Sequence, residues 1–299
     1  LFSTFCFANM LGLNISASFN SAVTIYILIP ILIIPQLLFS GVMVKFDKLN
    51  PIITSQSVVP LVGDMMCSRW AFEALAVKQF KDNKFTRKTY KFDKAIHIAT
   101  YKKDYWLTEI AKKIDFCESN YKKPESRQEV EAALKMIQNE IRKELKIPGN
   151  EKLKCGGLEN VNLAGFSPTV ANQLRDFTNN TLRTVYLNNF KRATTLREKE
   201  VSKMNTDSVA RAQYIKDKNE YENESLQDLV TNRNTPYRIL DLDGAYVQKI
   251  DPIYLDPVDS DMGRAHFFAP RKKFFGKYYD TYNVNICVIW GMSLILAIT

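Results

Sequence analysis

The chain has 299 residues, a net charge of +9 and 46% hydrophobic residues. Every Lys and Arg lies between Lys45 and Lys277, so the positive charge belongs to the middle of the chain and both ends are apolar. The basic residues are interspersed with acidic ones and accompany no basic–aromatic reading motif, which argues against nucleic acid as a partner.

The first 44 residues carry no charged side chain and predict transmembrane helices. Residues 23–44 are long enough to cross a hydrocarbon core, which takes about 20 apolar residues. Pro30 and Pro35 lie inside this run and Gly41 near its end, so we expect a bent helix. A buried helix of a large soluble protein is the alternative.

Residues 1–19 are interpreted as the tail of an earlier membrane helix, because a signal peptide would have a basic start. The chain also stops inside an apolar run, residues 284–299. We therefore expect a fragment of a longer membrane protein. The stretch between residues 14 and 21 would be a tight link between antiparallel neighbouring helices.

Residues 45–85 predict an interfacial region that contains an amphipathic helix. The sequence KFDK at residues 45–48 has the basic and aromatic residues typical of a water interface. Farther along, Arg69 and Glu73 stand four residues apart, which predicts an ion pair on one helix face. A packed surface helix is the alternative for this segment.

These segments together resemble a known family. The residues are PQLLFSGVMV (35–44), the Asn50-Pro51 pair and SRWAFEAL (68–75). They resemble the end of the type-2 ABC exporter membrane domain, the family that includes the ABCG or White-type transporters. The ending FFAPRKKFFGKYYDTYNVNICVIWGM (267–292) is similar to bacterial members of the Bacteroidetes type. The resemblance covers roughly residues 1–85 and 265–299.

The resemblance implies a mainly α fold: polytopic transmembrane helices with a large, mostly helical extracytoplasmic insert at residues 86–265. It implies the permease part of an ATP-driven exporter, multi-pass in the bacterial inner membrane and in contact with the lipid bilayer. ATP and magnesium would bind a nucleotide-binding domain outside these residues, on the same or a partner chain, in a dimer of transporter halves. Pro30, Pro35, Gly41, Arg69 and Glu73 would be relevant to transport. Family members have a short loop where this chain has the insert.

The insert itself reads as mostly helical. Ser126 and Glu129 have the spacing of a capping box ahead of a helix over residues 125–147. Ser167-Pro168 predicts the start of another helix. Prolines, an Asp243-Gly244 pair and alternating residues predict turns and short strands within 235–257.

The insert contains part of a calcium-binding motif and two cysteines. Asp241, Asp243 and Gly244 match only part of a calcium-binding EF-hand loop, whose later ligands are missing. If the insert is extracytoplasmic, a disulfide becomes possible, and Cys117 with Cys155 is the pair we expect.

Residues 266–283 are dense in aromatic and basic residues, and residues 284–299 are the start of a further membrane helix. Because the dense segment directly precedes an apolar run, it is interpreted as an interfacial belt, in which rings lie at the headgroups and cations meet lipid phosphate. Stacking on nucleic-acid bases is the less favoured interpretation.

The sequence contains no recognisable catalytic constellation. Its two histidines, His97 and His266, are far apart, and no phosphate loop or nucleophile motif is present. No cofactor or metal site is therefore expected within these residues, and any ATPase activity would belong to the missing domain. The alternative function is a non-transporting, membrane-anchored scaffold whose helical insert binds an envelope partner.

Overall fold

The computed structural model describes residues 1–46, 49, 56–242, 244–258 and 262–298. Asp47, Lys48, the Asn50-Pro51 pair and Asp243 lie outside the described residues. The protein is mainly helical, at 67%, and divides into two compact units. Unit 1 comprises Leu1–Lys88, Ala212–Arg233 and Asp251–Thr299, and unit 2 comprises Thr89–Arg211 and Asn234–Ile250. The predicted insert, 86–265, therefore differs from unit 2, because 212–233 and 251–265 belong with the chain ends.

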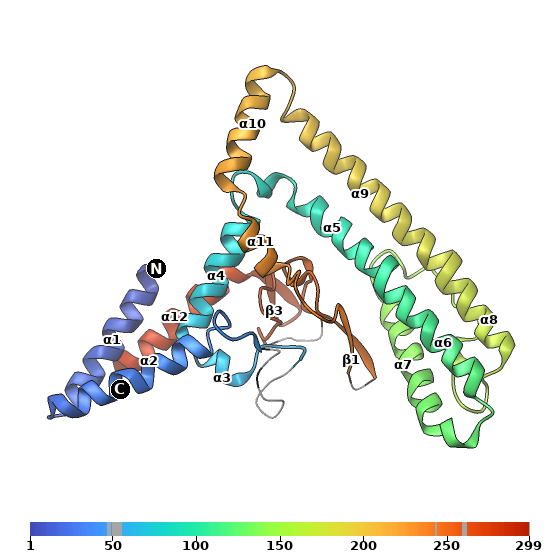
Figure 1. Ribbon diagram of the computed structural model, residues 1–299, viewed down its shortest axis with the longest axis horizontal. Coiled ribbons are helices and arrows are strands. Elements are labelled where there is room, and N and C mark those ends of the chain that lie inside the picture. The colour runs from blue at the N-terminus through green and yellow to red at the C-terminus, as the bar shows by residue number, and fades with distance from the viewer. Residues whose placement is uncertain (47–48, 50–55, 243, 259–261, 299) are drawn as a thin grey trace. The chain divides into compact units, whose positions relative to one another are not determined.

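Unit 1 joins apolar helices to a β-hairpin and several short helices (Figure 1). Its elements are α1 (Phe2–Ser18), α2 (Ala22–Leu38), α3 (Leu61–Asp64), α4 (Cys67–Lys81), a 3₁₀ turn (Thr86–Lys88), α11 (Glu224–Val230), a 3₁₀ turn (Pro252–Tyr254), β3 (Arg271–Phe274), β4 (Lys277–Asp280) and α12 (Thr281–Ile298). Helix α10 (Ser208–Tyr221) crosses the division between the units.

The prediction of polytopic transmembrane helices is wrong for this structure. Within the described ranges, α12 is the one helix long and apolar enough to cross a membrane. Helix α2 ends at Leu38 after 17 residues, because the chain turns there: the Ser40 hydroxyl donates to the Leu37 carbonyl, and Gly41 adopts φ +80°. The residues that the structure describes form no bundle of membrane-spanning helices.

Helix α12 is the element around which the helices of unit 1 pack. Helices α4 and α1 both lie against it, and the Asn14 amide donates to the Leu296 carbonyl at 2.6 Å. Cys67, Trp70 and Ile289 form a small buried cluster between α4 and α12. This packing places the first turns of α12 beside the middle of α4.

Strands β3 and β4 form a hairpin directly before α12. They pair antiparallel from Arg271 opposite Asp280 to Phe274 opposite Lys277, so that only two residues form the loop. Opposed residues share a face of a hairpin, so Lys272 lies on the same face as Tyr279, although Lys272 is buried and Tyr279 is exposed. Sequence analysis treated this segment as an interfacial belt and did not predict strands.

Unit 2 is a helical layer with one small hairpin (Figure 1). Its elements are α5 (Tyr90–Thr100), a π-helical segment (Tyr101–Trp106), α6 (Leu107–Asn120), a 3₁₀ turn (Pro124–Ser126), α7 (Arg127–Leu145), a 3₁₀ turn (Leu158–Asn160), α8 (Pro168–Asp176), a π-helical segment (Phe177–Leu182), α9 (Arg183–Lys203), β1 (Ile239–Leu242) and β2 (Ala245–Gln248).

The helices of unit 2 pack around one hydrophobic core. Helix α9 packs along α5, and α6 packs against α7 and α8. Val130, Leu134, Ile137 and Ile141 of α7 are all buried in that core, as their helical spacing predicts. The short strands predicted within 235–257 are present as β1 and β2, which pair antiparallel.

Two predicted helix starts differ in outcome. Ser167 caps α8, since its hydroxyl accepts a hydrogen bond from the Val170 amide, and that prediction is confirmed. The capping box at Ser126 is wrong, because Ser126 makes no side-chain cap bond. A 3₁₀ turn over Pro124–Ser126 leads into α7 instead.

Candidate functional site

Several buried charged residues of unit 1 lie on or against α4. Arg69 and Glu73 are only 1% and 0% exposed although both are charged. Charged side chains are almost never fully buried unless they are paired, and the four-residue spacing puts both on one face of the helix. Their predicted contact is present, with 3.4 Å between Arg69 Nη1 and Glu73 Oε2.

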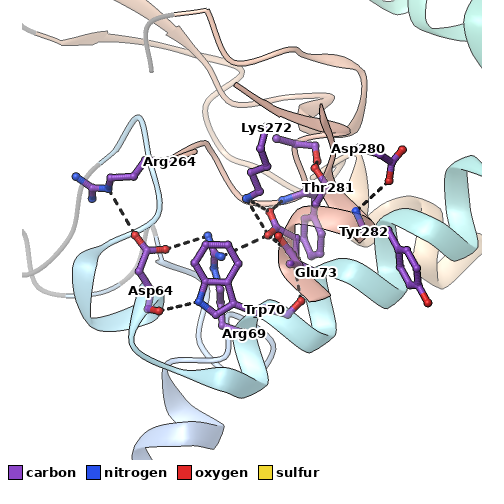
Figure 2. A network of polar contacts seen from close by, with 12 residues as sticks. Asp64, Arg69, Trp70, Glu73, Arg264, Lys272, Asp280, Thr281 and Tyr282 are labelled. Carbon is purple, nitrogen blue, oxygen red and sulfur yellow. Dashed lines mark hydrogen bonds and ion pairs between the residues drawn. The ribbon is translucent and has the colours of Figure 1, made fainter. Parts of the chain in front are cut away.

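Glu73 is the centre of this network (Figure 2). The Lys272 ammonium donates to both carboxylate oxygens at 2.9 and 3.0 Å, and Lys272 is itself fully buried. The Asn285 amide donates to Oε2 at 2.8 Å, and the Phe268 backbone N–H donates to Oε1 at 3.2 Å. One carboxylate therefore joins α4 to β3, to the loop before it and to α12.

Arg69 extends the network to α3. Its guanidinium contacts the Asp64 carboxylate at 3.1 Å and stacks 3.9 Å from the centre of the Trp70 ring. Asp64 also meets the Arg264 guanidinium at 3.5 Å, and its carbonyl accepts from the Trp70 indole at 2.7 Å. Figure 2 shows these groups side by side on α3, α4 and the loop before β3.

Burial and the neighbouring opposite charges shift the pKa values of these groups in opposite directions. Burial would raise the pKa of the Glu73 carboxyl, but the Lys272 ammonium and the Arg69 guanidinium outweigh it and hold that pKa below its usual range. Burial lowers the pKa of Lys272 to about 8, against the raising effect of Glu73. Burial raises the pKa of Asp64, against Arg69 and Arg264. At neutral pH Glu73 and Lys272 thus form an ion pair shielded from water.

The loop before β3 is bent to supply one of the donors to Glu73. Phe268 has φ +64°, a conformation that is uncommon for a bulky residue. Such strain costs of order 1–3 kcal/mol and persists where the surroundings impose it. Here the conformation accompanies the hydrogen bond from the Phe268 amide to Glu73.

The structure does not bring all the residues predicted as transport-relevant together. Pro30 and Pro35 lie inside α2. The last turn of α2 meets the first turn of α4, where the Ser68 hydroxyl donates to the Gln36 carbonyl at 2.5 Å. Gly41 follows α2, and a Cβ there would lie 2.7 Å from the Phe267 ring. Gly41 is therefore required by close aromatic packing at its position.

Lys272 and Asn285 were missed by sequence analysis. Lys272 is one of three consecutive basic residues, and nothing in the sequence distinguishes it from its exposed neighbours. Asn285 offered a weak signal, because it is a polar residue near the start of an apolar helix. Both lie about 200 residues from Glu73 in the sequence.

A second buried polar cluster lies within unit 2. Glu144 of α7 accepts hydrogen bonds from Lys102 at 2.6 Å, from Asn150 at 2.8 Å and from the Tyr186 hydroxyl. One turn earlier, Glu140 accepts from the Trp106 indole at 2.7 Å. These bonds satisfy both carboxylates. They connect α7 to the π-helical segment that contains Lys102 and Trp106, and to α9, which contains Tyr186.

The cysteines of the expected disulfide are both free. Cys117 Sγ faces the Val130 carbonyl at 4.0 Å, whereas Cys155 Sγ faces its neighbour's carbonyl, that of Gly156, at 3.7 Å. Burial raises the pKa of the two thiols to about 12 and about 11, so both are protonated at neutral pH. The Cys117–Cys155 bond is not formed in this structure.

No group of His, Cys, Asp and Glu among the described residues is arranged to hold a metal ion. The α4 network is instead a set of paired charges, in which the buried Nε and Nη1 of Arg69 make no hydrogen bond. Its contacts connect α4 to neighbouring elements, which suits it to fastening them together. Comparison with known proteins adds no assignment, and the family resemblance stays a prediction: no protein-family model, no curated protein and no solved structure matches this chain.

Proposed function

We propose that this chain is the membrane-associated part of an ATP-driven exporter of the ABC-2/ABCG-like class. ATP and magnesium would bind a nucleotide-binding domain on the same or a partner chain, and two transporter halves would form a dimer. Helix α12 would cross the inner membrane, and the helical unit 2 would lie outside the cytoplasm. In such a transporter, nucleotide biases two arrangements of the membrane part.

The observation that carries this proposal is the position of the residues that create the family resemblance. Arg69, Trp70 and Glu73 of the SRWAFEAL segment all lie in the network that fastens α4 to the first turns of α12. The Asn285 amide of α12 bonds to α4, and Glu73 also pairs with the buried Lys272 of β3, in the hairpin that leads directly into α12. Breaking such a buried ion pair costs about 3–5 kcal/mol. Helix α4 and the start of the membrane helix would therefore move as one body when nucleotide changes the transporter's state.

The test begins with the intact parent protein, isolated from native membranes through this chain. We expect peptides with a phosphate loop to co-purify and the preparation to hydrolyse ATP. Glu73→Gln should uncouple transport from ATP hydrolysis, whereas Glu159→Gln, the same change on an exposed side chain of unit 2, should leave coupling intact. Absence of an ATPase from the purified parent would contradict the proposal.

The location of unit 2 has a separate test. Lys143 is half-exposed on α7, so a cysteine placed there can be labelled. A membrane-impermeant maleimide should label Lys143→Cys in intact cells whose outer membrane has been made permeable. Labelling only after the inner membrane is opened would place unit 2 in the cytoplasm.

A second candidate function is a non-transporting, membrane-anchored scaffold whose helical unit binds an envelope partner. It is favoured by one observation: among the residues that the structure describes, a single helix can cross a membrane, while unit 2 has its own hydrophobic core. In that case the parent would purify with an envelope protein and without ATPase activity.

A further inference from the structure

The loop of the β3–β4 hairpin consists of Phe275 and Gly276, both with positive φ, at +47° and +76°. Two-residue loops of this kind favour Asn-Gly or Asp-Gly, because a bulky side chain is strained at the first position. The preferred residues would relieve that strain, so the stability of the hairpin does not account for a phenylalanine at position 275.

The two adjacent phenylalanines of this hairpin have opposite surroundings. The Phe274 ring packs on Gly263, where a Cβ would lie 2.1 Å from it, and meets the Tyr279 ring edge to face. Phe275 is 85% exposed. Phe274 is therefore part of the fold, while the strained turn presents Phe275 to the surroundings.

The basic and aromatic residues near Phe275 indicate what kind of surface it contacts. Arg271, Lys273 and Lys277 lie on the same hairpin, and the Arg271 guanidinium stacks 4.7 Å from the exposed Tyr278 ring. Helix α12 begins at Thr281, directly after β4. Aromatic rings with basic neighbours beside the end of an apolar helix are typical of residues at the headgroups of anionic lipids.

We propose that the tip of this hairpin is a lipid-binding finger that inserts Phe275 among the headgroups of an anionic membrane surface. This inference rests on the membrane association in the proposed function, and it adds a second lipid contact next to α12. Insertion of the ring removes it from water, and the exposed Lys277 beside the tip meets a lipid phosphate, whereas Arg271 is already paired with Asp256.

The test uses the full chain carrying Phe275→Trp and Trp290→Phe, incorporated into vesicles that contain phosphatidylglycerol with brominated acyl chains. The chain with Trp290→Phe alone gives the signal of Trp70 and Trp106, which is subtracted. The remaining emission, that of the new tryptophan, should be quenched, more by bromines near the headgroup than by those near the chain end. Lipid should also shield it from aqueous acrylamide. Tyr237→Trp, at an exposed position of unit 2, is the matched control and should stay open to acrylamide.

Phe275→Gly distinguishes lipid binding from a structural role of Phe275, because the two roles predict opposite changes in the melting temperature. Glycine adopts positive φ without strain, so the melting temperature should stay equal or rise. The hairpin should at the same time lose its shielding by lipid, read from a Tyr278→Trp reporter. A fall in melting temperature with unchanged shielding would overturn the proposal.

The native Trp290 on α12 distinguishes failure of this inference from failure of the proposed function. Quenching of Trp290 by bromolipid without quenching at position 275 would leave α12 in the membrane and refute the finger. If neither position is quenched, the membrane association itself is wrong. Shielding of position 275 that depends on protein concentration and not on lipid would assign the tip to a second copy, and would also refute the finger.

Discussion

At the residue scale, the ion pair between Glu73 and Lys272 is the contact most sensitive to substitution. Glu73→Leu leaves the fully buried Lys272 ammonium without its carboxylate. Breaking such a pair by removing one partner costs about 3–5 kcal/mol. We expect that loss in the free energy of unfolding of unit 1, measured by denaturant titration.

The double variant and an exposed pair provide the controls for this prediction. Glu73→Leu with Lys272→Met removes both charges, so it should cost clearly less than the sum of the two single changes. The pair of Arg142 with Glu159 is largely exposed, so Glu159→Gln should change stability by less than about 1 kcal/mol. Equal losses at Glu73 and Glu159 would show that the network is open to water.

His266 makes the stability of unit 1 depend on pH. Burial lowers the pKa of its imidazole from 6.5 to about 4, against the raising effect of its bond to the Pro252 carbonyl, to which Nε2 donates at 2.9 Å. The unfolded chain therefore binds the proton more readily than the folded one. The stabilisation is complete above pH 6.5 and is lost as pH falls toward 4, by up to about 3 kcal/mol.

The measurement is the free energy of unfolding at several pH values across that window. His266→Gln should flatten the pH dependence between pH 6.5 and 5. An unchanged slope in the variant would show that another group is responsible.

At the scale of elements, the two serines that precede α7 and α8 form a matched pair. Ser167 accepts a bond from the Val170 amide at 3.4 Å, a long bond, and Ser126 makes no cap bond. Ser167→Ala should therefore destabilise unit 2 by about 0.5–1 kcal/mol. Ser126→Ala should lie within about 0.5 kcal/mol of the parent, and thermal unfolding of the two variants will show whether they differ.

Helix α2 shows why apolar composition alone misled at this scale. The apolar run continues to Val44, and its length and composition predicted a helix over the whole run. Tertiary contacts end the helix at Leu38 instead, because Gly41 turns against the rings of Phe46 and Phe267. Phe267 lies in a distant part of the chain, whereas Phe46 is nearby and the bond from Ser40 to Leu37 lies inside the run. The run therefore contains only part of the information that ends the helix.

At the scale of the whole molecule, local patterns predicted local structure and did not reveal long-range contacts. The stripe of α7, the cap at Ser167 and the contact between Arg69 and Glu73 all depend on spacings of three or four residues. Lys272 and Asn285 reach Glu73 only after the chain has folded. The division into two units likewise depends on segments that return from distant parts of the sequence.

The presence of two cores predicts that damage to one unit stays within it. Ile137 is fully buried in the core of unit 2, and Ile137→Ala should cost about 2–5 kcal/mol. Amides of α6, α7 and α8 that exchange through unfolding of this unit should then exchange at least about thirtyfold faster. Hydrogen exchange with mass spectrometry should find the amides of α4 and α12 unchanged, because their buried cluster contains no residue of unit 2.

Glu73→Leu is the reciprocal variant. It should accelerate amide exchange in α4 and α12 and leave exchange in α7 unchanged. If either substitution accelerates exchange equally in both units, the protein unfolds as one cooperative body, and the separation into two units does not extend to its energetics.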